Sequence, residues 1–183
     1  MRKNSMGEKE MQDRLFSDRQ LIKLMIPLVI EQGLTILVGM CDGVMVSAVS
    51  EAAISGVSLV DMINAVILVL FAALATGGAV VTSQLLGARR TADARRSAGQ
   101  LVSLTFAMGC LMMTLCLIFA RGLLRLFFGS IADDVMAAGL IYLRITALSF
   151  PFIALYNAGA AIFRSVGNSK VSMQVSLWMN GIN

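Results

Sequence analysis

The chain has 183 residues with a formal net charge of +4, and 57% of the residues are hydrophobic. Only 14% are charged, against about 25% in an average soluble domain, and the mean hydropathy of +0.80 indicates a membrane protein. There is no His and no Walker A or GxGxxG motif, so we expect neither an enzyme nor a cofactor, and transport would draw on an ion gradient or another subunit. The three Cys lie in apolar runs without metal or redox spacing and are interpreted as small core residues.

The first twenty residues, MRKNSMGEKEMQDRLFSDRQ, carry both signs of charge and contain no apolar stretch. They lack the hydrophobic region that a cleavable signal peptide requires. We therefore predict a cytoplasmic N-terminal tail over residues 1–20 and a transmembrane region over residues 21–183. From about Met11 onward, the tail has two open interpretations, an amphipathic turn or a solvated segment.

Five apolar segments follow the tail, and about 20 apolar residues suffice to cross the hydrocarbon core of a bilayer. The predicted helices lie near 22–47, 57–86, 97–120 and 136–163, and a fifth begins near 171. The second is longer than a bilayer requires, so it should tilt or project from the membrane. The fifth is still apolar at Asn183, and we expect the chain to be a fragment of a longer, all-α polytopic membrane protein.

Lys and Arg are distributed unevenly between the predicted loops. Twelve of them fall in the region through Lys23 and in the 87–96 and 164–170 loops, whereas the 48–56 loop has none and the 121–135 loop has two. The positive-inside rule places the N-terminus in the cytoplasm. The positive net charge thus reflects membrane topology, and no nucleic-acid partner is expected.

Two acidic residues lie inside the first apolar segment. Glu31 and Asp42 are eleven residues apart, which brings both to within about 20° of one helix face, about 16 Å apart along the axis, with Thr35 between them. An ionised side chain facing lipid at mid-depth costs at least about 2.5–3.5 kcal/mol, so this face should point into a bundle or a wet cavity. A carboxylate there can exchange protons or accept a cation.

Each carboxylate also has a structural interpretation. Asp42 either binds an ion, or lies near the outer interface, or only ties helices together. Glu31 either shares the cavity with Asp42, or makes a structural hydrogen bond, or lies at the inner interface. The sequence leaves these alternatives open.

Small residues and prolines interrupt the apolar segments. Gly39 and Gly43 form a GxxxG pattern around Asp42, which favours close packing of another helix. Pro27 lies near the start of the first helix and Pro151 well inside the fourth, and each removes a backbone N–H, so that the helix kinks or a carbonyl loses its partner. For Pro27 the alternative is an ordinary proline in the first two turns.

Further polar residues lie in the later segments. Asp61 is interpreted as a first-turn residue of the second helix, favoured by the helix dipole, and Asn64 is a candidate cavity residue one turn further in. Arg144, inside the fourth segment, either pairs with a carboxylate or extends to the interface. Tyr156 and Asn157 either line a pathway or form hydrogen bonds between helices.

Three stretches resemble a known family. LMIPLVIEQGLTILVGMCDGVMVS is similar to the first transmembrane helix of the multidrug and toxic compound extrusion (MATE) family, with Pro27 and Asp42 on the proline and aspartate of that family. QLLGARR resembles the Gly-Ala loop after its second helix, and FRSVGNSK resembles its connection between the fourth and fifth helices. The similarity runs from about residue 21 to the end of the chain, and the three stretches occur in the family's order.

The resemblance implies a twelve-helix transporter of two six-helix lobes in the plasma membrane, which exports organic, often cationic, compounds in exchange for Na⁺ or H⁺. This chain would supply most of the N-terminal lobe, and its partners would be the missing C-terminal half of the same protein, the lipid bilayer and a small organic substrate. Asp42 would bind the coupling cation or proton. Asn183 matches the asparagine of the family's fifth-helix Asn-x-x-x-Asp pattern, and Asn180 is the alternative register. Ser47 departs from the family, in which many members carry Gly.

These residues support one leading hypothesis and two alternatives. In the first, cation binding at Asp42 bends the first helix at Pro27 or at the flanking glycines and so drives antiport. In the second, the protein is a lipid-linked oligosaccharide flippase of the same superfamily, which needs a cationic cavity for which Arg144 is the only candidate. In the third, it is a membrane scaffold subunit that transports nothing.

Overall fold

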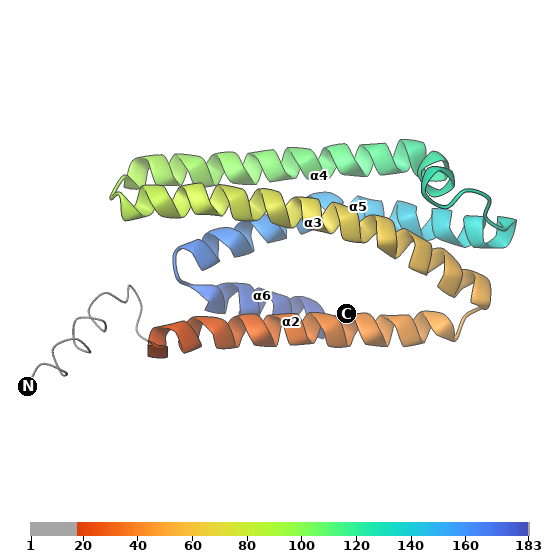
Figure 1. Cartoon of the computed structure of the whole chain (residues 1–183), viewed down its shortest axis with the longest axis horizontal. Helices are drawn as coiled ribbons and strands as arrows, with labels where there is room; N and C mark the ends of the chain where they lie inside the picture. Colours follow the sequence, from red (N-terminus) through yellow and green to blue (C-terminus); the bar gives the residue numbers. More distant parts are fainter. Residues whose placement is uncertain (1–17, 183) are drawn as a thin grey trace, which may run out of the picture.

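The structure is a computed structural model that describes residues 18–182, without the side chains of residues 18–20, 23, 24 and 180–182. Short turns connect five helices, each antiparallel to the one before it (Figure 1). In chain order these are α2 Asp18–Ser47, α3 Glu51–Gly87, α4 Thr91–Phe128, α5 Asp133–Ser165 and α6 Ser169–Ile182. The predicted all-α, five-helix fold class is therefore confirmed.

Four of the described helices are long and apolar enough to cross a membrane: Met25–Ser47 within α2, and the whole of α3, α4 and α5. Their mean hydropathies lie between 1.5 and 2.4. The 37 residues of α3 correspond to about 56 Å, whereas a hydrocarbon core is about 30 Å thick. This helix must therefore tilt within the membrane or extend beyond it.

The two ends of the helix bundle differ in charge. At one end α2, α4 and α6 begin while α3 and α5 finish, and the turns there and the helix termini beside them contain Arg89, Arg90, Arg95, Arg96, Arg164 and Lys170. We call this the basic end. At the opposite end, which we call the far end, the connections 48–50 and 129–132 contain no Lys or Arg, and the helix termini beside them contain Arg121 and Arg125 together with the acids Glu51, Asp133 and Asp134.

Two helices begin about six residues before the positions predicted from hydropathy, because their first turns are polar. The Ser50 hydroxyl accepts a hydrogen bond from the Ala53 amide at 3.0 Å and caps α3. In the first turn of α4, Arg90 and Asp93 form an ion pair at 2.8 Å. Since α3 begins at Glu51, Asp61 lies about three turns inside the helix, and the interpretation of Asp61 as a first-turn residue is wrong.

The helical backbone angles are interrupted in α4, which contains no proline, and not at Pro27 or Pro151. Helix α5 continues through Pro151 as far as Ser165. The break lies instead in α4, where Phe119 has non-helical angles (φ −104°, ψ 15°), and the chain then turns sharply before the helix ends at Phe128 (Figure 1). The predicted end of this segment near 120 thus coincides with a kink.

Helices α3, α4 and α5 form a three-helix bundle around one apolar core. Phe71 of α3 and Phe150 of α5 meet edge to face with ring centroids 6.2 Å apart, and both are fully buried. Glycines allow the helices to approach closely. A Cβ on Gly109 of α4 would lie 2.7 Å from the Cα of Pro151, so Pro151 marks the point where α4 crosses α5.

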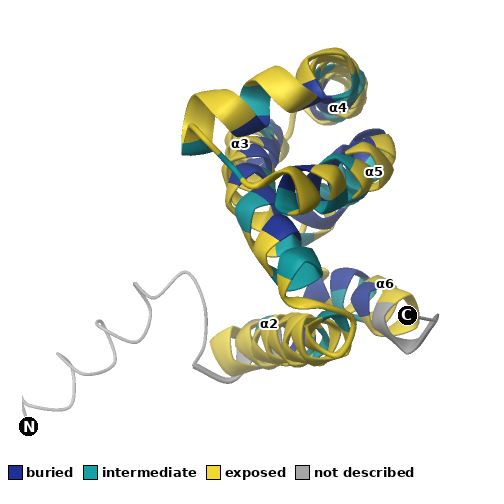
Figure 2. Ribbon diagram, turned by 90° about the vertical axis from the view of Figure 1, so that its right-hand side faces the viewer, coloured by how far each residue is buried: buried dark blue, intermediate teal, exposed yellow. Residues whose placement is uncertain are grey.

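Helices α2 and α6 lie side by side and apart from the three-helix bundle, as the end-on view in Figure 2 shows. They contact α3 and α5 far less than those two helices contact each other. Along α2, the described side chains that are buried are Pro27 and Glu31, and Leu34 and Val38 continue the same face half-buried. A Cβ on Gly39 or Gly43 would meet no atom within 4 Å, so the close helix contact predicted for this GxxxG is not made with the described helices.

The contact between Gly109 and Pro151 predicts a stability difference between two glycines of one helix. Alanine favours a helix over glycine by about 1 kcal/mol, but a methyl group at 109 forces two backbones apart, which typically costs about 1–3 kcal/mol. We expect Gly109→Ala to lower the thermal unfolding midpoint of the full-length protein in detergent. Gly99→Ala, where the added Cβ meets nothing within 4 Å, is the matched control and should leave the midpoint unchanged or raise it. Equal midpoints for the two variants would contradict the crossing.

Candidate functional site

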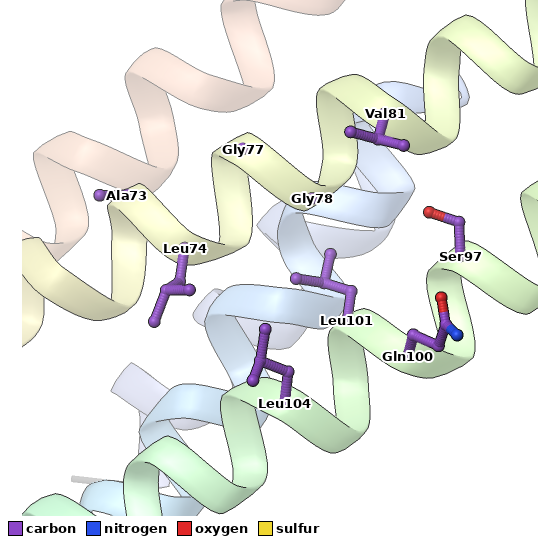
Figure 3. Close-up of a pocket in the computed structure, with 9 residues that line it drawn as sticks. All are labelled: Ala73, Leu74, Gly77, Gly78, Val81, Ser97, Gln100, Leu101 and Leu104. Atoms are coloured by element: carbon purple, nitrogen blue, oxygen red, sulfur yellow. The ribbon is translucent and has the colours of Figure 1, made fainter.

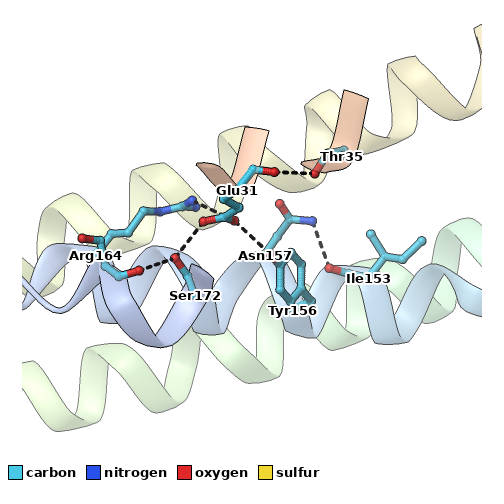
Figure 4. Close-up of polar contacts among 8 residues, drawn as sticks. Glu31, Thr35, Ile153, Tyr156, Asn157, Arg164 and Ser172 are labelled. Carbon is cyan, nitrogen blue, oxygen red and sulfur yellow. Dashed lines mark hydrogen bonds and ion pairs between the residues drawn. The ribbon is translucent and has the colours of Figure 1, made fainter. Parts of the chain in front are cut away.

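Glu31 is the centre of a polar cluster that joins three helices (Figure 4). Glu31 lies on α2, and 4% of the residue is exposed. Tyr156 of α5 donates its hydroxyl hydrogen to Oε1 of Glu31 at 2.9 Å, and Ser172 of α6 donates to Oε2 at 2.9 Å. Both carboxylate oxygens are therefore satisfied by hydroxyl groups from other helices, as a buried carboxylate requires.

Arg164 adds a positive charge to this cluster. Its Nη1 lies 3.8 Å from Oε1 of Glu31, which is an ion-pair contact and too long for a hydrogen bond. The Arg164 side chain is 33% exposed whereas that of Glu31 is 6% exposed. The guanidinium thus reaches solvent at the basic end while it offsets the charge of the buried carboxylate.

The position of Ser172 follows from the turn that precedes it. Helix α6 begins at Ser169, so Ser172 lies in its first turn, close to the 166–168 connection from α5. The Ser172 hydroxyl also lies 3.1 Å from the carbonyl oxygen of Ser169. Because a hydroxyl has one proton, the carboxylate at 2.9 Å competes with this carbonyl, and a charged acceptor forms the stronger bond.

The other predicted polar residues of this region point elsewhere. Thr35 is exposed and donates to the backbone oxygen of Glu31 at 3.0 Å, and Asn157 donates to the backbone oxygen of Ile153 at 2.9 Å. Both bonds lie within a single helix. Tyr156 forms the interhelical hydrogen bond that was one of its two predicted roles, so of the three only Tyr156 belongs to the Glu31 cluster.

A second polar group lies nearer the far end. The Tyr142 hydroxyl of α5 donates to Oδ1 of Asp61 on α3 at 3.1 Å, and Asp42 of α2 is close enough to Tyr142 to interact with it electrostatically. Asp42 and Asp61 are both exposed. One turn further along α3, the buried Oδ1 of Asn64 has no hydrogen-bond partner among the described residues. Three helices, α2, α3 and α5, thus contribute oxygen atoms to this second group.

Glu31 and Asp42 share a helix face by sequence spacing but differ in environment. Glu31 is buried beside α5 and α6, whereas Asp42, eleven residues later, is exposed. The face of α2 that carries both acids is therefore covered by other helices at the basic end and exposed toward the far end. Asn183 lies outside the described residues and the Asn180 side chain is not described, so their predicted roles beside Asp42 stay predictions.

Arg144 does not join either group. It is exposed on α5 and forms no ion pair with the residues that the structure describes. Tyr142, only two positions earlier, points toward α3, and two residues along a helix correspond to a rotation of about 200°. Arg144 therefore projects from a different face of α5 than the polar residues.

Sequence reasoning missed three residues that complete these groups: Tyr142, Ser172 and, as a site residue, Arg164. Tyr142 is one of only two tyrosines in the chain, and both donate to a carboxylate on another helix. The available signal was a tyrosine in one apolar segment of a chain whose other apolar segments contain acidic residues. Ser172 carried none, since serine is common in helices that pack closely in membranes.

A cavity between two helices of the bundle is separate from both polar groups. It has a volume of about 530 Å³ and lies between α3 and α4, with Leu74, Gly77 and Gly78 on one side and Leu101 and Leu104 on the other (Figure 3). Ser97 and Gln100 are its polar residues. None of the site residues predicted from sequence lines it.

An antiparallel bundle of apolar helices, with the buried carboxylate of Glu31 and the exposed carboxylates of Asp42 and Asp61 inside the apolar spans, defines a polytopic membrane protein. The profile of the MatE family matches residues 27–183. Because that match covers most of the chain, the chain belongs to this family of transporters.

Known proteins agree with this assignment. The chain is 30% identical over 172 residues to an uncharacterized transporter, YisQ, of Bacillus subtilis (strain 168), covering 93% of this chain and 36% of that protein. Among solved structures, a MOP superfamily transporter from Pyrococcus furiosus matches with a TM-score of 0.82 at 23% identity, over 88% of this chain and 35% of that one. A structure described as the outward-facing conformation of a multidrug resistance MATE family transporter matches with a TM-score of 0.81 at 22% identity, over 88% and 35% of the two chains.

These structural likenesses concern the fold. The chain spans about a third of the length of each of these relatives, at 35–36%. It therefore corresponds to part of a transporter, as the sequence predicted.

The bond between Tyr142 and Asp61 predicts a measurable energetic coupling between α3 and α5. Interhelical hydrogen bonds in a membrane protein average about 0.6 kcal/mol by double-mutant cycles. We expect Tyr142→Phe and Asp61→Ala in the full-length protein to show a coupling of that order in SDS-induced unfolding. The pair Tyr142→Phe and Glu51→Ala, which shares no bond, serves as the control and should be additive. Additivity in the first pair would rule out the hydrogen bond.

Proposed function

We propose that the full-length protein is a secondary antiporter that exports organic, often cationic, compounds in exchange for Na⁺ or H⁺. Membership in a transporter family and the placement of Asp42 support this proposal. In it, Asp42 binds the coupling cation or proton, and Asn183 or Asn180 of the fifth membrane helix assists. The predicted topology places the N-terminus in the cytoplasm and the protein in the plasma membrane.

The observation that carries the proposal is an accessible carboxylate inside an apolar span. Asp42 lies in the span Met25–Ser47, five residues from its end, and is exposed beside Tyr142. A carboxylate in this environment is reached by ions from the far end of the bundle. Tyr142, which interacts with Asp42, and Asp61, which accepts the Tyr142 hydroxyl hydrogen, supply oxygen atoms of the kind that H⁺ and Na⁺ prefer.

A simple energy comparison shows how Asp42 can couple an ion to a conformational change. Enclosing an ionised carboxylate at mid-membrane costs about 2.5–3.5 kcal/mol, and binding H⁺ or Na⁺ removes most of that cost. A differential of this size shifts a two-state equilibrium by about two orders of magnitude. The ion-loaded protein can therefore enclose Asp42 and rearrange α2, whereas the empty protein resists enclosure.

Replacing Asp42 tests this function directly. Asp42→Asn keeps the size and polarity of the side chain but removes the charge that binds the ion. We expect gradient-driven export of a hydrophobic cation such as ethidium from inverted membrane vesicles to fall to the background rate, with membrane insertion intact. Glu51→Gln, at an exposed acid in the first turn of α3, should export normally. Unchanged export by Asp42→Asn would refute the assigned role, and a change in association without any flux would favour the scaffold alternative.

The flippase alternative depends on a cationic cavity, for which Arg144 was the candidate. Because Arg144 projects from a different face of α5 than Tyr142, we expect Arg144→Gln to export the hydrophobic cation at the rate of the unmodified protein. Arg144→Lys, which keeps the charge, is the matched control. Loss of export in the glutamine variant alone, or preferential binding of labelled lipid headgroups over hydrophobic cations, would support the flippase instead.

A further inference from the structure

The attachment of α2 to the rest of the molecule is different at its two ends. At the far end, residues 48–50 connect α2 covalently to α3. At the basic end α2 packs directly against α6, and the side chains of Tyr156 and Arg164 connect it to α5. The position of the basic half of α2 thus depends on non-covalent contacts, and the described polar contacts there converge on Glu31.

The Glu31 cluster differs from apolar helix packing because the buried carboxylate is stable only while its partners on the other helices stay in place. A carboxylate that is 4% exposed is tolerated only while Tyr156 and Ser172 donate to it and Arg164 is near. If α2 moves away from α5, the carboxylate loses one hydrogen bond and the nearby cation together. Water must then enter to solvate it, because an uncompensated charge is not stable among apolar side chains. Separation of α2 and α5 at this level and entry of water from the basic end are therefore a single event.

Hydroxyl and guanidinium donors come from both helices that pack against this part of α2. On α5 these are Tyr156 and Arg164, and on α6 Ser172 is joined by the buried Ser176, which lies beside the Tyr156 hydroxyl. Lys170, at the start of α6, is exposed. Tyr156, Ser172 and Arg164 thus stabilise the closed arrangement of the three helices.

We infer that Glu31, with Tyr156, Ser172 and Arg164, forms a gate that closes the lobe at its basic end. Glu31 is a positioning residue in this gate and is distinct from the ion-binding role proposed for Asp42. Helix α2 carries both Glu31 and Asp42. In this structure the lobe is closed beside Glu31, while Asp42 is accessible. The inference rests on the proposed function only in assuming that the protein alternates between accessible ends.

Site-specific labelling tests the gate without substrate or coupling ion. In the full-length protein, Cys41 and Cys110 are replaced by serine and Leu34 by cysteine, since Leu34 follows Glu31 on the half-buried face of α2, further from the basic end. Cys116, which is 3% exposed in the bundle core, is retained to report unfolding. A membrane-impermeant maleimide is applied to vesicles of each orientation, and labelling at each position is read by peptide mass spectrometry.

We expect Glu31→Ala in this background to speed labelling at position 34 from the basic-end side by about tenfold or more, the effect of losing bonds to a buried charge. Labelling from the opposite side should not rise, and Cys116 should stay protected. Tyr156→Phe should give a smaller increase, and Ser172→Thr, which keeps the hydroxyl, should stay closer to the unmodified rate than Ser172→Ala. Glu51→Ala, outside the cluster, is the control and should not change the rate.

Unchanged labelling at position 34 in Glu31→Ala, with Cys116 protected, would overturn the gate. If Cys116 also becomes labelled, the variant has unfolded, and the milder Glu31→Gln and Tyr156→Phe variants decide. Each must then speed labelling at position 34 while Cys116 stays protected, or the inference fails. A failure here leaves the export test of Asp42 unaffected, because that test measures ion coupling and this one measures access.

Discussion

The constraint that governs this molecule is that a polar group inside a membrane needs a partner from the protein itself. The apolar helices satisfy their own backbones, and most of their side chains need no partner. A small number of ionisable side chains are exceptions. Glu31 meets the constraint through donors on two other helices, while Asp61 meets it through the Tyr142 hydroxyl. The relative placement of α2, α3, α5 and α6 is therefore tied to these few bonds.

Apolar packing divides the molecule into a closely packed bundle of α3, α4 and α5 and a more loosely packed pair, α2 and α6. In α3, α4 and α5, close contacts at Gly56 and Gly109 and the buried pair of Phe71 and Phe150 fix the helices against one another. Helix α2 has no such contact, since its glycines meet open space. Dispersion and close backbone approach stabilise membrane helix pairs, so α2 and α6 can shift relative to the bundle at lower cost than α3, α4 or α5 can shift within it.

The helices were predictable from sequence because hydropathy and positive charge directly report which segments lie in lipid. Their ends were less predictable. Polar first turns such as Ser50–Glu51 fall below a hydropathy threshold although they are helical, and this error misplaced Asp61 in the first turn of α3. The crossing of α4 and α5 at Gly109 and Pro151 depends on which helices are neighbours, and spacing within a single segment does not encode that.

The same limit applies to the candidate site. Spacing correctly placed Glu31 and Asp42 inside one apolar helix, but their shared face did not imply a shared environment, because α5 and α6 cover only the part near Glu31. Tyr156 was recognised as a candidate, whereas Ser172 and Tyr142 became site residues only through contacts across many positions of sequence. Contacts between residues of different helices decide which polar side chains are buried in hydrogen bonds and which are accessible.

The two acids of α2 consequently act on one rigid element from different depths. They are separated by eleven residues, about 16 Å along the helix, and α2 is helical throughout this interval. A rotation or tilt that draws Asp42 into a less polar environment must also displace Glu31 relative to Tyr156 and Arg164, unless the helix bends between them. Both changes are unfavourable while the carboxylates are ionised: an ionised Asp42 at mid-depth would cost about 2.5–3.5 kcal/mol, and Glu31 would lose its contacts with Tyr156 and Arg164. In the proposed function, cation binding at Asp42 removes the first of these two costs and so favours this movement of α2.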